Sequence, residues 1–101
     1  MTASTSFDHI IRNGLVIDGS GGAGVKADIG ISGDRILAIG DLSHLDAAQV
    51  TDAAGMVVAP GFIDVHTHDD ASLIIRPDME AKLSQGVTTV ICGNCGIRGA
   101  L

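Results

Sequence analysis

Two histidines separated by one residue, His66 and His68, are the side chains of this sequence best suited to chemistry. They end an apolar segment that we expect to form a strand over residues 62–68. Side chains at positions i and i+2 of a strand point to the same face, which Asp64 would share. Two adjacent imidazoles can bind one metal ion, and imidazole suits zinc and related metals. The alternative is a pair of polar residues that end a strand where it meets solvent.

Two cysteines, Cys92 and Cys95, form a second candidate site. A C-x-x-C motif can bind zinc or act as a redox pair. Cys92 continues an apolar strand and is expected to be a packed thiol. Cys95 falls just past the strand end and is the better ligand candidate. A shared site of both cysteines with both histidines stays open if their strands are neighbours.

A glycine-rich stretch, Gly19-x-Gly21-x-x-Gly24, matches the dinucleotide-binding fingerprint by letter. That fingerprint must open a helix whose N-terminus holds the pyrophosphate. Residues 25–32 instead alternate between apolar and polar types, as a half-buried strand does. We therefore interpret the stretch as a connection between strands.

Short strands and tight turns fill residues 1–59, which we expect to form a small β-sandwich-like domain. Asn13-Gly14 predicts a hairpin turn between strands at 7–12 and 15–17, and Gly33-Asp34 predicts a second hairpin.

From residue 60 onward the pattern changes to a strand, a helix and a second strand. Such a unit belongs to a parallel sheet or barrel, where sites lie at the C-terminal ends of the strands. We expect Asp78 to cap the helix and Gly86 to occupy its C′ position. The predicted segments are a strand at 62–68, a loop at 69–77, a helix at 79–85 and a strand at 87–92.

Composition excludes several classes of function. The 101 residues carry a formal charge of −6, with two Phe and no Trp or Tyr. An acidic chain with few aromatics is not expected to bind nucleic acid or an anionic membrane surface. Its apolar runs are far shorter than the roughly 20 residues of a membrane span. Without a signal-peptide pattern, and with only two closely spaced cysteines, we expect a cytoplasmic location.

Residues 58–68, V-A-P-G-F-I-D-V-H-T-H, resemble the amidohydrolase superfamily. L-S-Q-G-V-T-T-V at 83–90 and G-N-C-G at 93–96 are similar to its D-aminoacylase (N-acyl-D-amino-acid deacylase) branch. The resemblance implies a mixed α/β fold. Residues 1–59 would be the small β-rich domain, and residues 60–101 the first β-α-β step of a metal-dependent (β/α)₈ barrel.

The resemblance also implies a zinc-dependent hydrolase that cleaves the amide bond of N-acyl-D-amino acids. His66 and His68 would be ligands of one metal position. Cys95 would supply a thiolate in place of the bridging acidic or modified lysine ligand of other branches. Asp64 would contact one of the ligand histidines and orient it without binding the metal itself. The general acid/base, an aspartate, is expected beyond Leu101.

A complete barrel takes about 250 residues. We therefore expect this chain to be the N-terminal part of such an enzyme, inactive alone and self-associating to cover its bare strands. The alternatives are a non-catalytic β-rich interaction module, or a small structural zinc module that uses both cysteines and both histidines.

Overall fold

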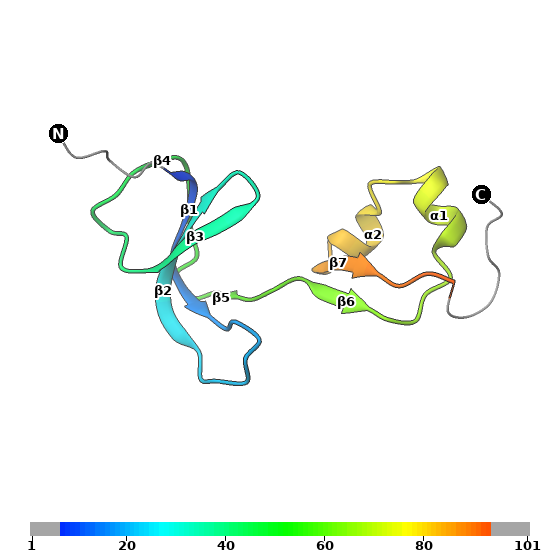
Figure 1. The fold of residues 1–101 in the computed structure, drawn as a ribbon, viewed down its shortest axis with the longest axis horizontal. Coiled ribbons are helices and arrows are strands. Elements are labelled where there is room, and N and C mark those ends of the chain that lie inside the picture. The colour runs from blue at the N-terminus through cyan, green and yellow to red at the C-terminus, as the bar shows by residue number, and fades with distance from the viewer. Residues whose placement is uncertain (1–6, 94–101) are drawn as a thin grey trace. The chain divides into compact units, whose positions relative to one another are not determined.

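The computed structural model describes residues 7–93, which fall into two compact units, Met1–Pro60 and Gly61–Leu101 (Figure 1). The first unit contains β1 (Phe7–Val16), β2 (Val25–Ser32), β3 (Arg35–Gly40), β4 (Ala47–Asp52) and β5 (Val57–Val58). The second contains β6 (Phe62–Asp64), α1 (Asp70–Ile75), α2 (Glu80–Leu83) and β7 (Val87–Val90).

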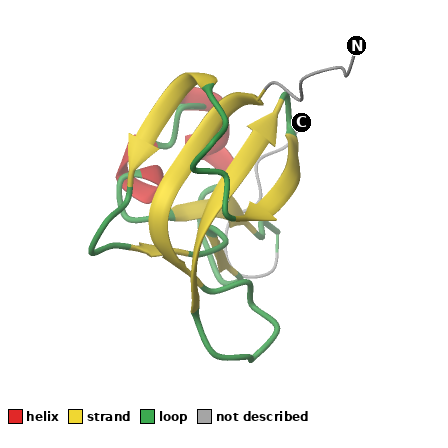
Figure 2. Cartoon of the chain, turned by 90° about the vertical axis from the view of Figure 1, so that its left-hand side faces the viewer, coloured by secondary structure: helices red, strands yellow, loops and turns green. Residues whose placement is uncertain are grey.

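The strands of the first unit form one mixed sheet around β1. Its order is β3-β2-β1-β4, and β5 also pairs with β1. β2 runs antiparallel to β1 and β3, whereas β4 and β5 run parallel to β1. The long strands curve strongly (Figure 2). The described strands of this unit therefore give a single curved sheet, and the second sheet of a β-sandwich-like domain is not among them.

The predicted hairpin at Asn13-Gly14 was wrong, because β1 continues through these residues. Asn13 has a φ of 64°, and the pairing with β2 shifts between Ile11 and Gly14. A positive φ beside a shifted register marks a β-bulge. The buried carboxylate of Asp28 secures it, accepting hydrogen bonds from the backbone N–H groups of Asn13 and Leu42, both at 2.9 Å.

The turn between β2 and β3 is where the sequence placed it, at Gly33-Asp34. Gly33 has a φ of 59°, a conformation that costs glycine little.

The core of the first unit is small. Phe7, Ile10 and Leu42 form its buried cluster. Gly30 lies against the Phe7 ring so closely that a Cβ built on it would be 2.7 Å from a ring carbon. Many large apolar side chains of this unit remain exposed, among them Val25, Ile36, Leu37, Ile39, Met56 and Val57.

The second unit holds the expected parallel strand pair, β6 beside β7. Both strands are shorter than predicted, since β6 ends at Asp64 and β7 at Val90. Two strands show the first step of a parallel sheet, and the described residues do not show a barrel.

The connection between these strands differs from the prediction. Residues 70–75, expected in a loop, form α1. The predicted Asp78 cap was wrong as well, because the N-cap of α2 is Met79, which has a φ of 47° and no side-chain capping hydrogen bond. Gly86 has the positive φ expected of it, 86°, but the C-cap of α2 is Ser84, so Gly86 lies one position past C′ and not at C′ as predicted.

Between residues 7 and 93, no helix has the length and apolar character needed to cross a bilayer.

Candidate metal centre

His66 and His68 lie just past the end of β6, in a segment that is neither strand nor helix. Their ring centroids are 6.0 Å apart, the ring planes are tilted by 50°, and both residues are exposed. The strand period therefore does not align them, because the strand stops two residues earlier. Their location at the C-terminal end of a parallel strand is the predicted one, and it is where α/β folds place their sites.

The separation of the two rings is close to that of a shared metal site. With zinc–nitrogen bonds of about 2.0–2.1 Å, two imidazoles on one tetrahedral ion place their centroids roughly 5 Å apart. The observed 6.0 Å is wider. The two rings would therefore have to move slightly closer to supply two of the four ligands that zinc usually takes.

Within residues 7–93, no group of three or more His, Cys, Asp and Glu side chains is arranged to hold a metal ion. Cys92 is half-buried, and its Sγ lies 3.9 Å from the hydroxyl of Thr67. A site that uses Cys92 together with both histidines is therefore not formed in this part of the chain. Cys95 lies outside the described residues, and its role as a thiolate ligand stays a prediction.

Asp64, the last residue of β6, contacts the histidine segment through its side chain, which binds a backbone N–H. Its Oδ1 accepts the N–H of His66 at 3.2 Å, and its Oδ2 lies 2.6 Å from Nζ of Lys82. The Lys82 ammonium holds the pKa of Asp64 below its ordinary 3.8, and Asp64 in turn raises the pKa of Lys82 above 10.5. Both groups are therefore charged at neutral pH. A role for Asp64 toward an imidazole stays a prediction.

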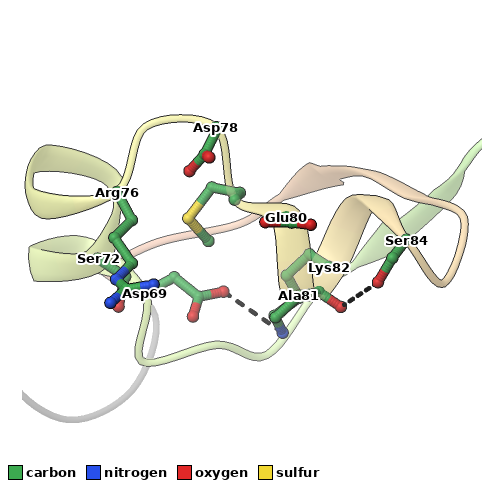
Figure 3. Close-up of a pocket in the computed structure, with 9 residues that line it drawn as sticks. Asp69, Ser72, Arg76, Asp78, Glu80, Ala81, Lys82 and Ser84 are labelled. Carbon is green, nitrogen blue, oxygen red and sulfur yellow. Dashed lines mark hydrogen bonds and ion pairs between the residues drawn. The ribbon is translucent and has the colours of Figure 1, made fainter.

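Lys82 also faces a second carboxylate, that of Asp69 (Figure 3). The distance from Nζ to Oδ2 is 3.4 Å, which makes an ion pair, while the same oxygen is buried without a hydrogen bond. Asp69 occupies the N-cap position of α1 but makes no capping hydrogen bond. Its carboxylate contributes to a pocket of about 480 Å³, which Lys82, Arg76 and Asp78 also line.

Thr67, between the two histidines, is a positioning residue that the sequence analysis missed. It is only 3% exposed, and its hydroxyl donates to the carbonyl of Ile91 at 3.0 Å. This bond ties the histidine segment to the residues that follow β7. The alternation of H-T-H would be a signal only within a strand, where the middle side chain points away from the flanking pair, and β6 ends before it. The contact of Lys82 with Asp64 had no local signal, since 18 positions separate them.

Residues 49–100 match a protein family described as "Amidohydrolase family". The chain belongs to the amidohydrolase family. The matched range includes His66, His68 and Cys95. The resemblance inferred from the sequence, including that to the D-aminoacylase branch, is thus confirmed.

This amidohydrolase chain is 58% identical over 94 residues to a D-aminoacylase of Alcaligenes xylosoxydans xylosoxydans. It is 56% identical over 93 residues to an N-acyl-D-glutamate deacylase of the same organism. The two alignments cover 93% and 92% of this chain and 19% of each relative. The chain therefore spans about a fifth of the length of these curated relatives.

Solved structures of N-acyl-D-amino-acid deacylases are also similar to this chain. One is an N-acyl-D-glutamate deacylase from Bordetella bronchiseptica complexed with zinc and a phosphonate inhibitor, a mimic of the tetrahedral intermediate. It matches with a TM-score of 0.89 and 48% identity, over 95% of this chain and 20% of that one. A D-aminoacylase with a binuclear metal center matches with a TM-score of 0.86 and 56% identity, over 94% and 20%. Relatives of this fold therefore bind metal, and zinc in one case.

Proposed function

We propose that this chain is part of a zinc-dependent amidohydrolase that cleaves the amide bond of N-acyl-D-amino acids. The observation that carries the proposal is the pair of accessible imidazoles at the C-terminal end of a parallel strand, with centroids 6.0 Å apart. The identity of 58% with a D-aminoacylase supports the substrate class.

The residues of this chain would have distinct roles at that centre. His66 and His68 would hold one metal position, with Cys95 contributing a thiolate. A zinc ion there supplies Lewis acidity, which lowers the pKa of water and polarises a carbonyl. Asp64 and Thr67 keep the histidine segment in place through the hydrogen bonds described above.

The chain alone is expected to be inactive. Zinc centres in hydrolases use three protein ligands and an open position, and an acid or base must move the proton. The described residues bring two ligands together. Steady hydrolysis of an N-acyl-D-amino acid by the pure 101-residue chain, lost on chelation, would contradict this expectation.

The proposal is tested by a chimera with the Alcaligenes D-aminoacylase. The matching 94 residues of that enzyme are replaced by those of this chain. We expect zinc-dependent hydrolysis of an N-acyl-D-amino acid, lost in His66→Ala and in His68→Ala. His44→Ala makes the same change at an exposed position of the first unit and should leave the rate unchanged. A folded chimera that binds no zinc, or equal rates in all three variants, would refute the proposal.

A further inference from the structure

The segment that carries the two histidines has no regular structure to hold it. Residues 65–69 lie between β6 and α1 and belong to neither. Backbone hydrogen bonds reach both flanks, from the Ile91 N–H to the Asp64 carbonyl and from the Leu73 N–H to the Asp69 carbonyl, both at 2.9 Å. The hydroxyl of Thr67 anchors the middle of the segment, and a further side chain contacts the carboxylates at its two ends.

Lys82 contacts both ends. Its Nζ lies 2.6 Å from Oδ2 of Asp64, directly before the segment, and 3.4 Å from Oδ2 of Asp69, its last residue. The three side chains are 17% to 31% exposed, so solvent screens them only in part. Asp69 does not cap its own helix, which leaves its carboxylate available to the lysine. Asp64 in turn accepts a hydrogen bond from the backbone N–H of His66.

We propose that Lys82 is a positioning residue that bridges Asp64 and Asp69 and thereby fixes the spacing of His66 and His68. The inference rests on the proposed function insofar as the histidines bind zinc. Lys82 itself is not a ligand, since its ammonium is directed at the carboxylate of Asp64 and at that of Asp69, the second of which Figure 3 shows.

Simple electrostatics predicts the opposite effect of removing this lysine. A positive charge near a cation site repels the cation, so neutralising it should tighten zinc binding. A positioning role predicts weaker binding, because the ligands lose their preset geometry. The sign of the change therefore separates the two explanations.

The first experiment compares Lys82→Met with Lys26→Met by calorimetric zinc titration of the chain. Lys26 lies on β2 in the first unit and is exposed, so it makes a control with the same change of charge. We expect zinc affinity to fall about tenfold in Lys82→Met, as when a partner of a ligand is lost, and to be unchanged in Lys26→Met. Lys82→Arg should recover part of the loss. Unchanged or tighter binding in Lys82→Met would overturn the proposal.

A second pair of variants applies if Lys82→Met does not fold. Asp69→Asn keeps the shape of the side chain and removes only the ion pair at 3.4 Å. Asp78→Asn is the control, because it makes the same change of charge at an exposed residue. We expect Asp69→Asn to weaken zinc binding more than Asp78→Asn does. Equal effects would overturn the proposal.

A readout without metal separates this inference from the proposed function. The backbone N–H of His66 is held by Asp64, and its hydrogen exchange reports how firmly the segment is fixed. Exchange should be about fivefold faster in Lys82→Met, or in Asp69→Asn if the first variant does not fold. Loss of a positive charge alone would slow this base-catalysed exchange. If the wild-type chain binds no zinc, the proposed function fails, and hydrogen exchange still tests whether Lys82 holds the histidine segment. An unchanged exchange rate of the His66 N–H in the variant would overturn the proposal for Lys82.

Discussion

Replacing Thr67 by valine tests the hydrogen bond that holds the histidine segment against the end of β7. The two side chains have nearly the same shape, so the change exchanges a hydroxyl for a methyl group without opening a cavity. At this site only 3% of Thr67 is exposed, and its hydroxyl donates to the carbonyl of Ile91 at 3.0 Å.

The expected cost follows from these contacts. A neutral hydrogen bond contributes about 0.5–1.5 kcal/mol net, and a buried carbonyl left without a donor costs roughly 1–3 kcal/mol. Ile91 is 42% exposed, which gives water some access and favours the lower figures. We therefore expect a local destabilisation of about 1 kcal/mol, or roughly fivefold faster opening.

The assay is hydrogen exchange of the Ile91 amide, which donates to the carbonyl of Asp64 at 2.9 Å and so reports on the same junction. The chain has no Trp or Tyr, so intrinsic fluorescence of these residues cannot follow unfolding, and exchange is read by NMR. Thr67→Ser retains the hydroxyl and should exchange more slowly than Thr67→Val. Thr89→Val makes the same change at an exposed position of β7 and should have no effect.

Equal exchange rates in Thr67→Val and Thr89→Val would refute this reasoning. They would show that the backbone ladder alone fixes the histidine segment.

Three further predictions concern stability and assembly. Gly30→Ala should destabilise the first unit by about 2 kcal/mol in urea followed by circular dichroism, because the new methyl would meet the Phe7 ring at 2.7 Å. Gly40→Ala, whose methyl would meet nothing within 4 Å, is the control, and equal effects would contradict the packing argument. The hydrogen bond from the Ala54 backbone N–H lowers the pKa of Asp52 below 3.8. The Asp52 carboxylate therefore stabilises the fold above pH 3.8, and this contribution is lost as the pH falls through the lowered pKa. Thermal unfolding of Asp52→Asn should thus depend less on pH below about pH 4 than that of the wild type; parallel curves would contradict this. Finally, the exposed apolar side chains of the second unit should make the chain self-associate in light scattering, and a monomer at high concentration would count against it.

The sequence was sufficient to place the two histidines at a strand end and insufficient for what holds their segment. H-x-H after an apolar run is a local pattern, and it predicted the position of His66 and His68 at a strand end. Val65 continues the apolar run, so the residue pattern did not indicate that β6 ends at Asp64. The bridge made by Lys82 depends on the fold of α1 and α2, which were predicted only in part.

The first unit shows the same limit. Asn13-Gly14 indicates a positive φ, which the structure has, but a positive φ suits a bulge as well as a hairpin turn. Only the pairing of β1 with β2 on both sides of Asn13 decides between them, and such pairing is not local. Equally, short strands with tight turns do not show whether the strands share one sheet or form two.

The central position of β1 has a consequence for how the first unit folds. Its partners in β4 and β5 lie about 40 positions further along, with His9 opposite Gln49 and Leu15 opposite Val57. Pairs this distant require a large loop to close before they contribute any stability, which places the sheet among slow, high-contact-order folds. During synthesis, the edge of β1 that pairs with β4 and β5 is not fully paired until Val58 has left the ribosome. Until then that edge is open to pairing with another nascent chain.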